Sequence, residues 1–142
     1  MLRLVLDTNV IVSALLRSGG FPEAAFSLGI NRVVQLCISQ PILDEYSEVL
    51  YRRRLAIDPV KVATAITKIC EVSHLIRPNA TVRACSDPDD NIFLECAEAS
   101  GADYLVTGNT AHFPDRWIKT EIVTPRRFVE IVIAMQHGKI VP

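Results

Sequence analysis

Three sets of carboxylate side chains mark the positions of this sequence that could do chemistry. Asp7 directly follows the apolar run over residues 2–6, Glu45 lies in an amphipathic helical stretch, and residues 87–90 read Asp-Pro-Asp-Asp. Ligands and catalytic groups in an open α/β sheet gather beyond the carboxyl ends of its strands, and we expect the strand before Asp7 to be central. Three carboxylates brought together there would bind a hard divalent cation and support metal-assisted phosphate chemistry.

Asp7 and Glu45 each have a purely structural alternative. Asp is a favoured helix N-cap, so Asp7 could cap the helical stretch after it, although Thr8 or Asn9 could do this equally well. Apolar residues on both sides of Asp7 favour the functional interpretation, because a desolvated carboxylate requires a cation or hydrogen bonds. Glu45 lies at the edge of the apolar arc of its helix, where a surface Glu that extends its carboxylate into water is the alternative.

The acidic residues near position 90 also fit two roles. Acids in the first turn of a helix complement its dipole, which would explain all three Asp residues of positions 87–90. Helical geometry, at about 100° per residue, places Asp90 beside the apolar arc that contains Ala97. We therefore predict that Asp90 faces the sheet as a ligand, with Asp89 as the reserve candidate and Asp87 directed toward water.

Residues 104–109, Tyr-Leu-Val-Thr-Gly-Asn, are a second apolar run that ends in polar residues. Thr107 and Asn109 are expected at the same sheet edge as Asp7, and Gly108 would let the backbone approach closely there. An ordinary turn from strand to loop is the alternative. His112 follows in a His-Phe-Pro turn, where a lone His is more often structural, so it is left out of the predicted catalytic set.

Strand-like and helix-like runs alternate along the chain, which is typical of a parallel sheet covered on both faces. The expected strands are residues 3–6, 33–38, 72–76, 104–106 and 121–123. The expected helices are residues 10–16, 22–28, 40–53, 59–71, 88–100 and about 125–135. This pattern predicts a three-layer α/β/α sandwich with a central parallel sheet of four to five strands, in a single domain over residues 1–142.

The composition excludes some classes of protein. A formal net charge of −1 and a pI of about 6.3 are not the basic footprint of a protein that binds nucleic acid by overall charge. The Arg clusters at residues 52–54 and 126–127 are either local phosphate contacts or solvated helix ends. No apolar run reaches the roughly 20 residues that span a bilayer, and the N-terminus lacks the features of a secretory signal, so we expect a cytoplasmic protein without a membrane partner.

The four cysteines show no C-x-x-C pairing and no metal-like spacing with His. We expect them to be reduced thiols, mostly in the core.

Taken together, these motifs resemble the PIN domain family of nucleases. Residues 4–16 (LVLDTNVIVSALL) are similar to the family's first strand and first Asp, and residues 39–50 (SQPILDEYSEVL) to the helix that carries its Glu. Residues 87–109 are similar to the helix with the third Asp and to the strand after it. The resemblance covers residues 2 to about 132 and is strongest with small prokaryotic PIN proteins that are toxins of toxin–antitoxin pairs.

This resemblance implies a metal-dependent ribonuclease that uses Mg²⁺ or Mn²⁺. Its metal ligands would be Asp7, Glu45 and Asp90. Neutral hydrogen bonds would come from Asn9, Thr107 and Asn109. The implied partners are an RNA substrate, a small antitoxin protein and a second copy of the chain in a homodimer. Many members have a fourth Asp at the position of Asn109, so a second metal ion would bind more weakly here.

Other functions compete with this one. A haloacid-dehalogenase-type phosphatase needs a second Asp two residues after the first, where this chain has Asn9. A receiver-like signalling domain needs a consecutive acidic pair after its first strand and a Lys on a late strand, and neither occurs here. The remaining alternative is a catalytically weak or inactive PIN module that binds RNA or protein.

Overall fold

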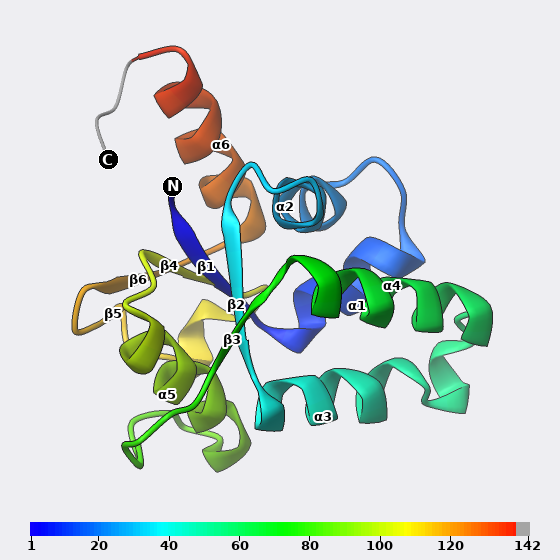
Figure 1. Cartoon of the computed structure of the whole chain (residues 1–142), viewed down its shortest axis with the longest axis horizontal. Coiled ribbons are helices and arrows are strands. Elements are labelled where there is room, and N and C mark those ends of the chain that lie inside the picture. Colours follow the sequence, from blue (N-terminus) through cyan, green and yellow to red (C-terminus); the bar gives the residue numbers. More distant parts are fainter. Residues whose placement is uncertain (139–142) are drawn as a thin grey trace.

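The computed structural model describes residues 1–138 of the chain, and Figure 1 labels its elements. The strands are β1 (Arg3–Leu6), β2 (Gln35–Ser39), β3 (His74–Ile76), β4 (Tyr104–Val106), β5 (Arg116–Trp117) and β6 (Thr120–Val123). The helices are α1 (Thr8–Leu16), α2 (Phe21–Ile30), α3 (Gln40–Leu50), α4 (Pro59–Val72), α5 (Asn91–Ser100) and α6 (Pro125–Gln136). Short 3-10 turns form η1 (Arg53–Leu55), η2 (Pro88–Asp90) and η3 (Thr110–His112).

The strands form one sheet in the order β3-β2-β1-β4-β6-β5. All neighbouring pairs are parallel except β5 and β6. β1 lies between β2 and β4, with Leu4 opposite Tyr104 and Leu6 opposite Val106, so the expectation of a central first strand is confirmed. The expected count of four to five strands is wrong, because the sheet has six. The strand that was not predicted is β5, which pairs antiparallel to β6.

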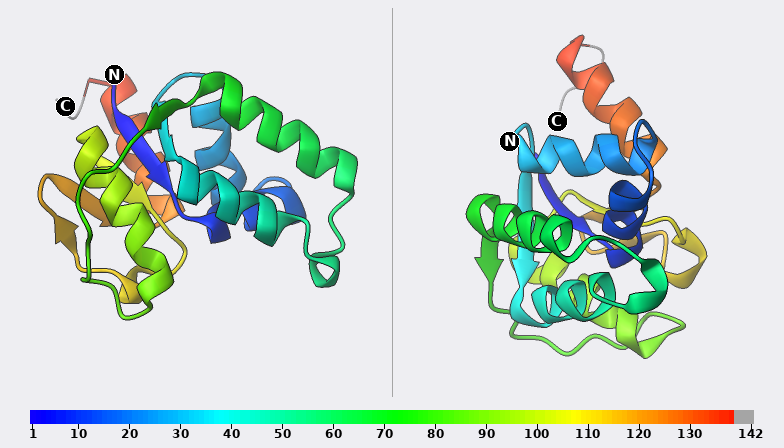
Figure 2. Two further views of the ribbon diagram at one scale, coloured as in Figure 1. Left: turned by 60° about the horizontal axis from the view of Figure 1, so that its bottom comes forward. Right: turned by 90° about the vertical axis from the view of Figure 1, so that its right-hand side faces the viewer.

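Helices cover both faces of this sheet (Figures 1 and 2), which confirms the predicted layered α/β architecture. α2 and α6 pack together on one face, and α5 packs against β1 and β2 on the other, with α3 beside it. Leu4 and Val5 of β1 are fully buried between these layers. Gly29 lets α2 lie close to β2, because a Cβ added there would be 2.6 Å from Leu36 Cγ.

Several predicted boundaries move by a few residues for local reasons. β2 begins at Gln35 rather than at residue 33, because the N–H groups of Val33 and Val34 donate to the Leu28 carbonyl at the end of α2. α3 ends at Leu50, and the chain turns into η1 where a helix through residue 53 was predicted. α5 begins at Asn91 because the preceding residues form the tighter turn η2.

Capping residues fix the ends of the helical segments that carry the site. The Ser39 hydroxyl accepts the Ile42 N–H at 3.4 Å and begins α3. The Asp87 carboxylate accepts the Asp89 N–H at 3.0 Å and begins η2. Gly101 ends α5 in the left-handed conformation, at φ 63°, which glycine adopts without strain.

None of the helices within residues 1–138 has the length and apolar composition to cross a membrane. The four cysteines are free; Cys37 and Cys96 are buried, Cys85 is half-buried, and Cys70 is exposed rather than part of the core. Burial raises the pKa of the Cys96 thiol to about 12, so this side chain behaves as a small apolar group.

Candidate active site

A cavity of about 380 Å³ lies at the carboxyl ends of the central strands, between α1, α3, η1, η2 and η3. Its lining includes five carboxylates, from Asp7, Glu45, Asp87, Asp89 and Asp90. Asp7 directly follows β1, and Glu45 projects from α3. The three acidic groups singled out by the sequence are therefore brought together at the edge of the sheet where ligands bind in open α/β folds.

Asp7 is held by the end of β4, the strand next to β1, and by the residue that follows it. Its backbone N–H donates to the Val106 carbonyl at 2.9 Å, and its Oδ2 accepts the Thr107 hydroxyl at 2.8 Å. Asp7 occupies the N-cap position of α1, but its side chain makes no capping hydrogen bond. The carboxylate is directed into the cavity region instead of closing the helix, although Asp7 as a whole is only 6% exposed.

The surroundings of the Asp7 carboxyl disfavour its ionised form. Its pKa is raised from 3.8 to about 6, chiefly by burial; the Thr107 hydroxyl opposes the shift, and the neighbouring charges of Asp90 and Glu45 add to it. Desolvation and like-charge repulsion thus both disfavour the ionised form. A cation bound at this position would relieve both effects.

Glu45 is positioned by the contacts of its own helix. The neighbouring Tyr46 is fully buried, and its hydroxyl donates to the Leu6 carbonyl, which ties α3 to β1. The Thr8 hydroxyl donates to Glu45 Oε2. Burial raises the pKa of the Glu45 carboxyl, the Thr8 hydroxyl opposes the shift, and the charge of Asp90 adds to it. Glu45 is thus a half-buried carboxylate that shares its surroundings with the other two acids.

Asp90 lines the cavity from the end of η2. Its side chain is 17% exposed, and Oδ2 lies 3.6 Å from Nδ1 of His112. Burial and the charge of Asp87 raise the pKa of the Asp90 carboxyl, whereas His112 lowers it. Asp89 and Asp87 also line the cavity but are exposed, and the Asp87 carboxylate is engaged as the cap of η2.

The three neutral residues of the predicted set make hydrogen bonds around the loop over residues 107–109. Thr107 is completely buried; its hydroxyl donates to Asp7 and accepts the Asn109 N–H at 3.0 Å. Asn9 Oδ1 accepts the Gly108 N–H at 3.1 Å. A Cβ added to Gly108 would lie 3.6 Å from that oxygen, an ordinary contact, so this hydrogen bond does not itself require a glycine.

His112 lines the cavity, although it was left out of the predicted catalytic set. It lies within 3.1 Å of the Asn109 side-chain amide nitrogen and pairs with Asp90. Arg52 and Arg54 also line the cavity. Their only signal in the sequence was the Arg cluster after the helix of Glu45, and nothing in its spacing showed that the chain turns back toward the acids.

The donor set was tested for its fit to a divalent metal ion. Within residues 1–138, no three His, Cys, Asp or Glu side chains converge closely enough to hold an ion as they lie. The chemistry of the donors nevertheless fits a hard cation: Asp7, Glu45 and Asp90 all have raised pKa values, chiefly from burial. In the same part of the chain, no Lys or Arg forms an ion pair with any of the three.

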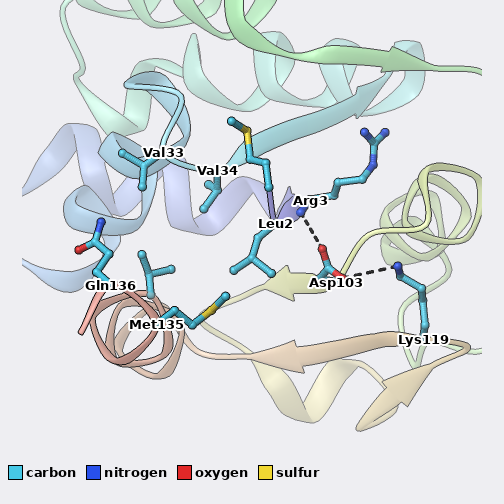
Figure 3. Close-up of a pocket in the computed structure, with 10 residues that line it drawn as sticks. Leu2, Arg3, Val33, Val34, Asp103, Lys119, Met135 and Gln136 are labelled. Atoms are coloured by element: carbon cyan, nitrogen blue, oxygen red, sulfur yellow. Dashed lines mark hydrogen bonds and ion pairs between the residues drawn. The ribbon is translucent and has the colours of Figure 1, made fainter. Parts of the chain in front are cut away.

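A larger cavity, of about 480 Å³, lies at the opposite edge of the sheet (Figure 3). It is lined mainly by apolar side chains, and its carboxylate, Asp103, already accepts the Arg3 N–H at 2.8 Å and pairs with Lys119 at 3.5 Å. This cavity is at the amino ends of the strands, away from the carboxylate group. The smaller cavity around Asp7 is therefore the better candidate for chemistry.

Comparison with known proteins shows the family of the chain. A family model described as PIN domain matches residues 3–111, which include Asp7, Glu45, Asp90 and Asn109. The chain belongs to the PIN domain family. Members of this family are generally nucleases and generally use divalent metals.

Individual relatives are more distant. The uncharacterized protein MJ1680 of Methanocaldococcus jannaschii is 27% identical over 141 aligned positions, which cover 91% of this chain and 90% of the relative. The solved structure of PAE2754 from Pyrobaculum aerophilum is 17% identical with a TM-score of 0.58, covering 94% of this chain and 90% of that one. VapBC2 from Rickettsia felis, solved bound to a DNA fragment from its promoter, is 16% identical with a TM-score of 0.57, covering 87% and 98%. The two structures support the fold.

Proposed function

We propose that this protein is a metal-dependent endoribonuclease that hydrolyses RNA phosphodiester bonds, and that the whole chain acts as one PIN nuclease domain. The observation that carries the proposal is the cavity around Asp7, Glu45 and Asp90. These carboxylates are desolvated and lack an ion-pair partner among the Lys and Arg side chains of residues 1–138. Burying a charged group without a counter-charge is costly, and groups with such raised pKa values cluster at functional sites.

Asp7, Glu45 and Asp90 are the proposed ligands of Mg²⁺ or Mn²⁺. When bound, the metal would supply a Lewis acid for the scissile phosphate and a water of lowered pKa. The role of this chain's other residues is positioning: the Thr107 hydroxyl orients Asp7, and the Thr8 hydroxyl orients Glu45. Asn9 and Asn109 border the cavity and offer neutral hydrogen-bonding groups to water or to RNA.

Asn109 brings no charge to the site, and this supports a centre with three carboxylates over one with four. A second metal ion would then bind weakly, since affinity for a hard cation depends on the number of charged ligands. The competing function is a PIN module that binds RNA or protein without cleaving it. A catalytic role requires cleavage that depends on both the metal and Asp7, whereas simple binding requires neither.

The likeness to the VapBC2 toxin–antitoxin structure and to the small PIN toxins supports a further part of the proposal. The protein would act in the cytoplasm as the toxin of such a pair, inhibited by a small antitoxin protein and assembled as a homodimer. Co-expression with the product of a neighbouring small reading frame, followed by light scattering of the purified sample, would reveal both partners by mass.

The central test is RNA cleavage by purified parent protein and by Asp7→Asn, each with Mg²⁺, with Mn²⁺ and with EDTA. Cleavage by the parent with either metal, and its loss with EDTA and in Asp7→Asn, is the expected result. Asp44→Asn is the matched control, because Asp44 is an exposed acid on the same helix as Glu45 and does not line the cavity. Equal cleavage by Asp7→Asn and the parent would contradict the assignment of Asp7.

A further inference from the structure

The cavity has two basic side chains on one rim and two exposed acids on another. Arg52 and Arg54 come from the segment that follows α3, whereas Asp87 and Asp89 come from the segment that precedes α5. An RNA backbone, which is a polyanion, meets attraction over η1 and repulsion over η2.

The Arg54 guanidinium has no side-chain partner within residues 1–138. Among residues 1–138, no side chain forms a hydrogen bond or an ion pair with its guanidinium, although it lines the same cavity as Asp7 and Glu45. An Arg guanidinium presents a planar fork of N–H donors that matches the oxygens of a phosphate group. Arg54 is therefore available to a ligand in a way that a paired Arg is not.

The backbone around Arg54 is defined by hydrogen bonds. The Leu55 N–H donates to the Arg52 carbonyl at 3.1 Å, and the Ala56 N–H donates to the Arg53 carbonyl at 3.0 Å. Ala56 then adopts a left-handed conformation, at φ 52°, which is unfavourable for a residue with a Cβ. These contacts fix the backbone on both sides of Arg54, whose side chain lines the cavity.

Arg52 forms an ion pair with Glu48 of α3. Its Nε and Nη2 donate to the two oxygens of Glu48, at 3.2 Å and 2.7 Å. Both side chains are well exposed, 40% for Arg52 and 63% for Glu48. An exposed ion pair of this kind contributes little and is readily exchanged for another anion. Arg52 can therefore turn from Glu48 to a phosphate without loss of the fold.

We propose that Arg54, assisted by Arg52, forms a subsite for the RNA phosphate next to the one that is cleaved. The inference rests on the proposed nuclease function, since it assumes that the scissile phosphate lies over Asp7, Glu45 and Asp90. The contact is to the backbone, so it positions RNA of any sequence and sets the side from which the strand enters. Bases are not read at this subsite.

Binding and cleavage can be measured separately. Affinity is measured in the Asp7→Asn background, by fluorescence anisotropy of a short labelled single-stranded RNA of mixed sequence, in Mg²⁺ buffer over a range of salt. Arg54→Gln is expected to weaken binding about five- to twentyfold, because it removes a charge-assisted contact at an exposed site. It should also reduce the salt slope of log K by about 0.7, the value for one phosphate contact on a single strand.

Arg53→Gln is the matched control, because Arg53 lies in the same turn, carries the same charge and does not line the cavity. It should bind RNA like its background protein. Arg54→Lys keeps the charge but lacks the planar fork of N–H donors. Its affinity for RNA should lie between that of the background protein and that of Arg54→Gln. Glu48→Gln releases Arg52 and should tighten binding. In the active parent, Arg54→Gln should raise KM and leave kcat near the parent value.

Equal affinity of the Arg54→Gln and Arg53→Gln proteins would overturn the subsite. If cleavage depends on Asp7 but these two variants bind alike, the nuclease function stands and the subsite is wrong. If no metal supports cleavage but Arg54→Gln alone loses affinity, the subsite stands as an RNA-binding site and the nuclease function is wrong. Circular dichroism of each variant excludes loss of fold as the cause, and the exposure of Arg54 makes such loss unexpected.

Discussion

Replacement of Asp7 by Asn should stabilise the metal-free protein at alkaline pH. Asp7 is 6% exposed, and burial raises the pKa of its carboxyl to about 6 from 3.8. The folded state therefore holds the proton more tightly than the unfolded state does. It follows that ionisation of Asp7 opposes folding, and that this penalty grows as the pH rises between the two pKa values.

The size of the effect follows from the shift in pKa. A shift of about two units at 1.36 kcal/mol each gives a penalty of about 3 kcal/mol at about pH 8. Below the unfolded pKa the penalty is absent, and near pH 4.5 it is about 1 kcal/mol. Asn keeps an oxygen that can accept the Thr107 hydroxyl, but its amide N–H groups need acceptors, which offsets the gain by about 1 kcal/mol. The expected net stabilisation at about pH 8 is thus about 2 kcal/mol.

Urea unfolding monitored by circular dichroism would measure this difference, with EDTA present to remove divalent ions. Parent, Asp7→Asn and the control Asp44→Asn should each be unfolded at about pH 8 and about pH 4.5. The advantage of Asp7→Asn should shrink by about 2 kcal/mol between the two pH values, and the control should show no such change. An Asp7→Asn protein that is less stable than the parent at about pH 8, or equally changed at both, would refute the reasoning.

Three further predictions concern the same site. Millimolar Mn²⁺ should raise the Tm of the parent by mass action but not that of Asp7→Asn; an unchanged parent Tm would speak against a metal site. Thr107→Val should lower the free energy of unfolding by about 2–3 kcal/mol, because it removes a bond to a charged group and leaves the Asn109 N–H unpaired. NMR titration should show the Asp7 pKa rising further in this variant, and an unchanged pKa would contradict the role of Thr107. Asn109→Asp should lower the Mn²⁺ concentration for half-maximal cleavage about tenfold; no change would place Asn109 outside the metal's surroundings.

Much of the fold could be predicted from the sequence, because local signals for strands and helices agree with the rules for packing them in layers. The run before Asp7 is short, apolar and followed at once by a carboxylate, and it is indeed the buried central strand. The Ser39 and Thr124 hydroxyls cap α3 and α6, and both are residue types that favour helix starts. These are contacts within a few residues, which a sequence displays directly.

The missed elements depend on partners that a sequence does not display. β5 is two residues long and has no periodicity of its own; it exists because Arg116 and Trp117 pair with β6 across a tight turn. η2 replaces the first turn of the predicted helix because Asp87 caps Asp89 closely. Neither apolar spacing nor propensity separates such a 3-10 turn from an α-helical one.

Which residues form the candidate site was more predictable than the hydrogen bonds that hold them. Acids at a strand end and on neighbouring helix faces indicated which carboxylates line one cavity. The hydroxyl that holds Asp7 comes from Thr107, and the one that holds Glu45 comes from Thr8. Both bonds join residues far apart in the chain, so only the folded structure could reveal them. Arg54 was visible only as one member of a basic cluster.

The pairing of β1 with β4 also has a consequence for how the protein is made. Asp7 emerges from the ribosome early, yet its N–H and carboxylate find their partners, Val106 and Thr107, only when β4 has been synthesised. Contacts between such distant segments form late and fold slowly. A nascent chain that stops before β4 therefore lacks the assembled pocket, and the proposed RNA cleavage can begin only after most of the polypeptide has been translated.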